Sequence, residues 1–389
     1  MTSIRRTALL GCATLVGLIG AGAARISGAD PLDTAFRFAT AIEVDPNDQA
    51  MAQERVVGDL IDRGRLDDAS RQAAKIKGWR QGTALADVAR AWAESGRKDR
   101  AREYVDRADA VRRVTADWGA PRIAAHMAEA LAAIGDLERS TSLAQGLAQE
   151  DAREYGGRAV AAVASGLAQT GDFKSAMARL SALDGERDFD IVWWRTSGYL
   201  DLARRPNLPE DERGQALQAA RRSADGVSGW KRGEALTSIG REHALRKEIP
   251  AAGQALGAAE QIIAPLSPTI PSKASLMSDL AAAWGVAGDR PRALSLLERA
   301  EKEVPEAAVI DRPAALAAIA GARESIGDRD LARALYDRSV SEAASLVNAR
   351  PRALAVVDIC RSLAKSGVGV TPPLQARLES LYAGLRDPW

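Results

Sequence analysis

Cysteine, histidine and aromatic residues are scarce in this chain of 389 residues, and neither sign of charge predominates. With two cysteines, two histidines and 4% aromatic residues, the composition disfavours a disulfide-stapled domain and a Cys/His metal centre. The 53 basic residues balance 52 acidic ones to a net charge of +1, which argues against a nucleic-acid binder. What the chain does have is alanine and aliphatic residues, within a hydrophobic content of 46%, and this composition favours helices.

The first 24 residues have the pattern of an export signal. Arg5 and Arg6 precede the uncharged, mostly apolar run Thr7–Ala24, and small residues at 21–23 offer a cleavage site. Two alternatives stay open: the run could remain as a membrane anchor, or Cys12 could be lipidated. We therefore expect an exported protein, periplasmic or extracellular, that contacts a membrane only through this segment if it is uncleaved.

A short pattern recurs along the rest of the chain: a helical apolar run, a turn residue that is usually glycine, and a small residue five positions later. The turn and small residues are Gly64/Ala69, Gly96/Ala101, Gly135/Ser140, Gly171/Ala176, Lys247/Ala252, Gly288/Ala293 and Gly327/Ala332, with a degenerate copy at Gly367/Pro372. A turn glycine is suited to a left-handed cap that ends the first helix of a hairpin. The Asp that often follows it is suited to N-capping the second helix.

The residues before each turn also have a fixed character. A large apolar residue comes eight positions before the turn and a small one seven before it, as in Val88-Ala89, Met127-Ala128 and Ile319-Ala320. A small residue there lets two antiparallel helices cross closely. With the alanine of the second helix, this pattern resembles tetratricopeptide repeats (TPR) over most of residues 48–382.

The resemblance implies an all-α, right-handed superhelical α-solenoid of about nine helix-turn-helix repeats. Residues 25–47 then form a linker and an N-terminal capping helix, and residues 383–389 a C-terminal tail. Near residues 204–210, Arg205-Pro206-Asn207-Leu208-Pro209 replaces the tight turn, so an irregular joint is expected there.

No catalytic signature, metal-ligand spacing or cofactor motif emerges from the sequence. His126 and His243 fall in different repeats without Cys or His neighbours at ligand spacing, and His243 occupies a core-facing position. Asp188, Asp190 and Asp201 form an acidic cluster near the pair Trp193-Trp194. A glycosidase would need two carboxyl groups facing each other across a cleft, and sequence alone cannot place these.

Two further residue types recur in register. Trp79, Trp118 and Trp230 each lie 17 positions before a turn residue, which favours a packing wedge between repeats and leaves open an aromatic edge for a peptide or glycan. Basic residues lie 15 positions before four turns, at the start of a helix, where a cation is disfavoured. Their recurrence suggests pairing with acids such as Glu234 or Asp311, or an exposed positive edge. The basic residues are Arg232, Lys273, Arg312 and Arg352.

If the resemblance holds, the first helices line a concave face walled mostly by small residues. These residues either admit a peptide or a partner helix closely or simply let neighbouring first helices pack tightly. The contact candidates on that face are Arg90, Arg241 and Arg361, six positions before their turns, with Arg122 and Arg158 one helical turn earlier. We expect a non-enzymatic scaffold that binds an unidentified protein or peptide there. The alternatives are a cell-envelope glycan or peptide binder that uses the Trp edge, and an enzyme built as an (α/α) toroid.

Overall fold

A computed structural model describes residues 30–116, 118–149, 153–186, 188–206, 208–270 and 272–386. All secondary structure in these ranges is helical, so the all-α prediction is confirmed. None of the helices found there is both long and apolar enough to cross a membrane. The expected leader, with its anchor and lipidation alternatives, lies outside the described residues.

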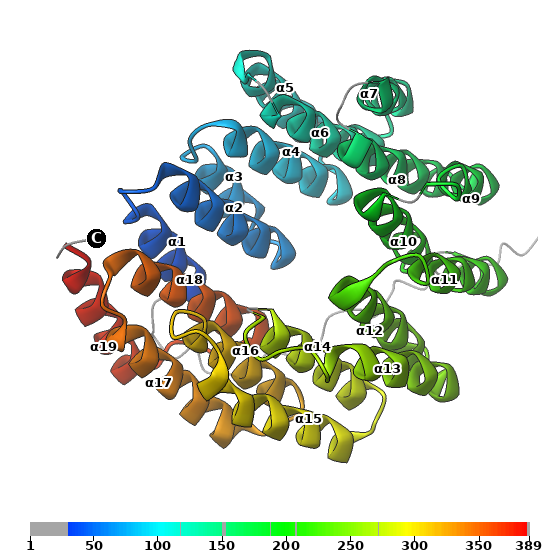
Figure 1. Ribbon diagram of the computed structural model, residues 1–389. Coiled ribbons are helices and arrows are strands. Elements are labelled where there is room, and N and C mark those ends of the chain that lie inside the picture. Colours follow the sequence, from blue (N-terminus) through cyan, green and yellow to red (C-terminus); the bar gives the residue numbers. More distant parts are fainter. Residues whose placement is uncertain are drawn as a thin grey trace, which may run out of the picture.

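The helices form two layers that curve into a ring (Figure 1). The inner layer consists of α2 (Pro46–Asp62), α4 (Trp79–Glu94), α6 (Gly119–Ile134), α8 (Arg153–Gln169), α10 (Phe189–Ala203), α12 (Gly229–Leu245), α14 (Lys273–Val286), α16 (Arg312–Ser325) and α18 (Ala349–Ser366). The outer layer consists of α3 (Leu66–Ala73), α5 (Lys98–Val114), α7 (Leu137–Gln149), α9 (Phe173–Ser181), α11 (Glu210–Ala224), α13 (Ile249–Ile263), α15 (Arg290–Glu303), α17 (Arg329–Ser345) and α19 (Pro372–Ala383). The remaining elements are α1 (Pro31–Thr40) and two short 3-10 helices, η1 (Val304–Glu306) and η2 (Gly384–Arg386). Each inner helix packs on the next, so the inner layer is a continuous helical-repeat wall.

Left-handed residues connect the inner helices to the outer ones, as the recurring turn predicted. Gly64, Gly96, Gly135, Gly171, Gly288, Gly327 and Gly367 all have positive φ. Lys247, which replaces glycine in one turn, is the only non-glycine residue with positive φ in the described ranges. Capping by the following Asp holds in three cases, because Asp136, Asp172 and Asp289 accept a hydrogen bond from the backbone N–H three residues on. Asp328 instead accepts a hydrogen bond from the Arg323 side chain.

Replacing Lys247 by glycine is expected to stabilise the protein by about 1 kcal/mol, because a side chain in the left-handed region costs roughly that much. Urea denaturation would measure the change. The matched variant Gly327→Ala, at the same turn position with a φ of 84° and open space around its Cβ, should lose a similar amount. Equal stability of both variants and the wild type would contradict a left-handed turn at these sites.

The interface between the layers is built from the predicted small residues. Ala69, Ala101, Ala176, Ala252, Ala293 and Ala332 are fully buried, five positions after their turns. Ser140 takes this place in α7, and its hydroxyl donates to the carbonyl of Ala128 on the facing helix at 2.8 Å. The predicted register of the hairpins is therefore confirmed at these positions.

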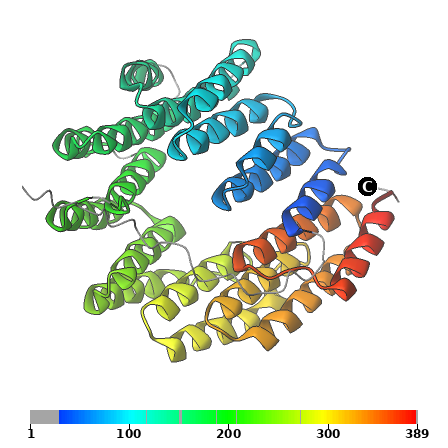
Figure 2. The same cartoon turned by 180° about the vertical axis from the view of Figure 1, so that it is seen from behind.

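The two ends of the described chain meet and close the ring. Helix α1 packs between α2 and α18 (Figure 2). It therefore takes the place that an outer helix takes beside each of the remaining inner helices. Its apolar face, which includes Leu32, Ala35 and Phe38, is buried. Phe38 also meets the Tyr382 ring edge-on, with 5.3 Å between the ring centroids. The closing hairpin thus combines the first helix with α18.

Ion pairs reinforce this seam between α1–α2 and α18–α19. Arg361 donates to both carboxylate oxygens of Asp59, and Lys365 approaches Asp59 at 3.4 Å. Arg37 and Glu379 pair at 2.5 Å on the surface. A superhelix that rises along its axis would hold its ends apart, so closure is a difference from the sequence expectation. Its physical reason is the apolar packing of α1 against both α2 and α18, in the place of an outer helix.

The segment between α10 and α11 differs from the tight turns elsewhere. Helix α10 ends at Ala203 and α11 begins only at Glu210. Arg205 of this segment donates to the carbonyl and hydroxyl oxygens of Ser165 on α8, which anchors it to the inner wall. Helices α10 and α12 pack on each other less extensively than the other neighbouring inner helices do.

Candidate functional site

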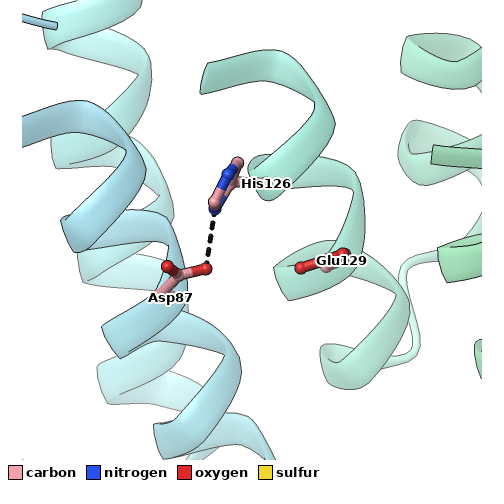
Figure 3. A group of neighbouring side chains, drawn as sticks. All are labelled: Asp87, His126 and Glu129. Carbon is pink, nitrogen blue, oxygen red and sulfur yellow. Dashed lines mark hydrogen bonds and ion pairs between the residues drawn. The ribbon is translucent and has the colours of Figure 1, made fainter. Parts of the chain in front are cut away.

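A group of charged side chains on the inner wall spans α4, α6 and α8. Asp87 and His126 each lie nine residues before a turn glycine, so the repeat places them side by side. The Nδ1 atom of His126 lies 2.8 Å from Asp87, while Arg158 donates from Nε and Nη2 to both oxygens of Glu129, at 2.7 and 2.9 Å. Arg158 also contacts Nε2 of His126. Figure 3 shows Asp87 on α4 facing His126 and Glu129 on α6.

The network keeps its carboxylates ionised. Burial alone would raise the pKa of Asp87, but the charges of His126 and Arg158 and the hydrogen bond with His126 hold this pKa well below its ordinary range. Burial likewise opposes ionisation of Glu129, and the charge and hydrogen bonds of Arg158 lower its pKa nevertheless. The pairs therefore stabilise the packing of three neighbouring repeats at neutral pH.

Asp87, His126 and Glu129 are also the set with metal-ligand potential in the described ranges, since one ligand atom from each lies within 4.8 Å of the others. Each of these atoms already bonds to another member or to Arg158. A divalent cation would have to displace the Arg158 guanidinium, which together with Arg90 opposes the negative charge of the two carboxylates. The arrangement is that of an ion-pair network.

Next to this network lies a cavity of about 470 Å³ on the inner wall between α4 and α10. Its floor consists of small residues and one aromatic side chain: Ala132, Ala133, Ala161, Ala162, Gly166, Gly198 and Trp194. Its polar lining comprises Arg90, Glu94, Glu129, Arg158, Ser165, Gln169, Ser197, Asp201, Arg204 and Arg205. Hydrogen-bond donors and acceptors of both charges thus surround a floor on which a ligand backbone could lie closely.

Asp201 differs from the other carboxylates of the cavity. Burial within the ring raises its pKa to about 6, against the opposing charge of Arg204, whose Nη1 lies 3.6 Å away. Its side chain is 59% exposed, and the like charge of Glu129 adds to the upward shift of its pKa. The site therefore gains a negative charge as the pH rises through about 6.

The structure brings together two of the five predicted contact arginines. Arg90 and Arg158 both line the cavity, on either side of Glu129. Arg122 lies over the rings of Trp79 and Tyr155, and Arg361 is bound to Asp59 in the seam. Arg241 is exposed on α12 and has no ion pair in the described part of the chain. Arg158 and Arg361 thus have their donors committed within the protein.

The tryptophans expected at an edge pack against neighbouring repeats to different extents. Trp79 and Trp118 meet edge to face with 4.8 Å between their centroids, and a Cβ added at Gly119 would come within 2.8 Å of Trp79. Trp118 and Trp230 remain partly exposed, the latter beneath the Lys231 ammonium. Trp79 therefore acts as a wedge between α4 and α6.

The basic residues at helix starts bind groups at the ends of outer helices. These groups precede Arg232 and Arg312 in the chain and follow Lys273 and Arg352, and the acids suggested from the sequence are not the partners. Arg232 pairs with Asp225 and Lys273 with Glu303. Arg312 and Arg352 donate to the backbone carbonyls of Pro305 and Gly384. These carbonyls and acids lie at the ends of outer helices, where a cation is favoured.

The structure also shows the surroundings of His243 and of Asp188 and Asp201, two of the acidic residues near Trp193. His243 is partly buried and bonds to Glu248 through Nδ1. Asp188 N-caps α10, whereas Asp201 lies at the far end of the same helix and enters the cavity beside Trp194. Sequence reasoning missed that Asp201 faces carboxylates of other repeats, because that proximity depends on the curvature of the ring.

No protein-family profile matches the chain, and no curated protein matches it. Among solved structures, one similar chain is described as a "Circular tandem repeat protein with novel repeat topology and enhanced subunit contact surfaces". The two are 12% identical, the match covers 92% of this chain and 94% of that one, and the TM-score is 0.20. Such a TM-score does not demonstrate a shared fold.

Proposed function

We propose that this protein is an exported, TPR-like helical scaffold that binds a peptide segment of a partner protein on the inner wall of its ring. The observation that carries the proposal is the cavity between α4 and α10, where polar groups converge over a floor of alanine and glycine. Small side chains let a peptide backbone approach the wall closely. Trp194 offers an apolar surface beside them, and the proposed role requires no cofactor.

Several polar groups of this cavity remain available to a ligand. Gln169 and Ser197 have no hydrogen-bond partner in the described ranges, and Asp201 has only the long contact with Arg204. These donors and acceptors can pair with the amide groups and polar side chains of an extended peptide, which would offset the desolvation of both surfaces.

Ser197→Trp is expected to lower recovery of the partner at least about tenfold, because an indole placed in the cavity blocks the floor and costs a well-packed interface more than about 1.4 kcal/mol. Quantitative affinity purification from an envelope fraction, followed by mass spectrometry, would measure recovery. Ser181→Trp, on the exposed end of the outer helix α9, is the matched control and should leave recovery unchanged. Equal recovery of the same specific partners by both variants would overturn the proposal.

A second candidate function rests on Asp201 alone. A carboxyl group with a pKa of about 6 in the same cavity as the ionised carboxylate of Glu129 is suited to general acid catalysis, such as glycoside hydrolysis in an (α/α) toroid. Hydrolysis of an aryl glycoside that disappears in Asp201→Asn would establish this function. A glycan that binds without being cleaved, and quenches Trp194 fluorescence, would instead indicate an envelope glycan binder.

A further inference from the structure

The ring has two rims of different construction. Because successive helices are antiparallel, every inner helix begins at one rim and ends at the other. The glycine turns lie on the rim where inner helices end, here called the turn rim. The connections from each outer helix to the next inner helix lie on the opposite rim, here called the loop rim.

Large exposed hydrophobic side chains gather on the loop rim. Around the ring, Val114 is 84% exposed at the end of α5, and Trp118, Phe189 and Trp230 are exposed at the starts of α6, α10 and α12. At the seam, Val347 is 89% exposed before α18, and Val44, Val309 and Ile310 are exposed in neighbouring connections. The turn rim carries half as many in the described ranges, namely Leu245, Ile249, Val286 and Leu331.

A large apolar cavity accompanies the seam part of this rim. Its volume is about 640 Å³, and its lining joins the two ends of the chain. The apolar lining is Val44, Met51, Ile310, Ala314, Pro351, Leu354 and Ala355, and the polar lining is Arg55, Asp311, Asn348, Arg350 and Asp358. The volume is in the range of pockets that enclose small ligands, and the apolar part of the wall suits a hydrocarbon chain.

We propose that the loop rim docks on the surface of a lipid bilayer, with its protruding side chains in the headgroup region and the seam cavity taking an acyl chain. The distribution of the protrusions favours a bilayer, because they are spread around the ring and a continuous flat apolar layer can meet all of them together. Tryptophan prefers the interface between water and hydrocarbon. Exposed Lys77 lies two residues before Trp79, whose ring meets Trp118, and complements anionic headgroups, whereas Arg113 beside Val114 is paired with Asp109.

This contact is independent of the N-terminal apolar segment. Asp30, the first described residue, pairs at 2.7 Å with Arg65, which directly follows the Gly64 turn. The chain therefore enters the ring at the turn rim, on the side opposite the proposed lipid contact. Removing residues 1–24 should leave the loop rim and its lipid binding intact, whether or not the inner cavity binds a peptide.

Vesicle flotation with the chain starting at Arg25, which retains every described residue, tests the proposal. We expect this chain to float with vesicles of phosphatidylcholine mixed equally with phosphatidylglycerol. Val114→Asp combined with Val347→Asp should reduce the bound fraction at least about tenfold, because two protruding apolar side chains no longer leave water. Their high exposure makes both substitutions compatible with folding, which the melting temperature would verify.

Leu245→Asp combined with Val286→Asp on the turn rim is the matched control, and its flotation should equal that of the wild type. Two results would overturn the proposal. The first is a wild-type chain that does not float with these vesicles, which is the result expected if the rim binds only protein. The second is an equal loss of binding in both double variants.

Discussion

Replacing Asp59 by alanine is expected to destabilise the protein by about 3–5 kcal/mol and to loosen the seam that closes the ring. The Asp59 side chain is only 4% exposed and accepts from Arg361, which is itself largely buried, with Lys365 nearby. Removing the carboxylate leaves the largely buried Arg361 guanidinium with only the longer contact to Asp358, at 3.4 Å, and this costs far more than the loss of a surface pair. Chemical denaturation would measure the free energy of unfolding.

Cys360 provides a second readout of the same variant. This thiol is fully buried on α18, beside α1, and burial raises its pKa to about 12. A thiol reagent should label Cys360 faster in Asp59→Ala than in the wild type, because opening of the seam exposes it. Glu379→Ala is the control, since its pair with Arg37 is exposed and contributes at most about 1 kcal/mol. Equal effects of the two variants would show that Asp59 has no special place in the closure.

Replacing Glu129 by alanine is expected to cost about 3 kcal/mol at neutral pH. Arg158 would lose both of its strong hydrogen bonds to Glu129 and remain in a site where its side chain is only 18% exposed. Glu94→Ala, which removes a carboxylate on the more exposed side of the same cavity, should cost at most about 1 kcal/mol. Thermal and urea denaturation of the two variants would measure the difference.

The same network predicts how stability depends on pH. Asp87 and Glu129 have folded pKa values below their ordinary values of 3.8 and 4.5. They therefore stabilise the fold fully above these ordinary values, and the stabilisation is lost as the pH falls below them toward the folded pKa values. The free energy of unfolding should fall less steeply below pH 4.5 in Glu129→Gln than in the wild type. Parallel pH profiles would contradict a stabilising role for this carboxylate.

The local architecture was predictable because each hairpin satisfies the same steric conditions. A glycine can take the left-handed turn and an alanine can sit at the helix crossing, so both leave a regular trace in the sequence. Lys247 shows that the turn keeps its left-handed conformation even without glycine, because its φ is positive like that of the glycines at the equivalent positions. The turns and the buried alanines were therefore predictable from local chemistry.

No comparable sequence pattern indicates that the ring closes. Helix α1 carries an amphipathic pattern that suits a terminal cap as well as an outer helix, and its partner α18 lies more than 300 residues away in sequence. Whether the ends meet depends on the small rotation between successive repeats, accumulated around the whole chain. The spacing of residues within one repeat does not determine this accumulated rotation.

The candidate site was predictable in part. Arg90 and Glu129 occupy the same register position in adjacent repeats with opposite charges, as do Asp87 and His126, and this signal could have revealed the network. The register of the arginines alone does not reveal the network. Arg158 and Arg361 fit the pattern of ligand-binding residues as long as the positions of their acidic partners are unknown. The cavity itself arises where α4, α6, α8 and α10 curve together, which no single repeat encodes.

The distance between the chain ends tests ring closure. Spin labels on Arg37→Cys and Glu379→Cys, in a chain that starts at Arg25 and carries Cys360→Ala, would report it by electron–electron double resonance. Alanine fits position 360, because it fills the equivalent position at Ala89 and Ala320. A closed ring predicts one short, narrow distance, as expected for residues whose native side chains touch. A long or broad distribution would show an open superhelix and contradict the closure.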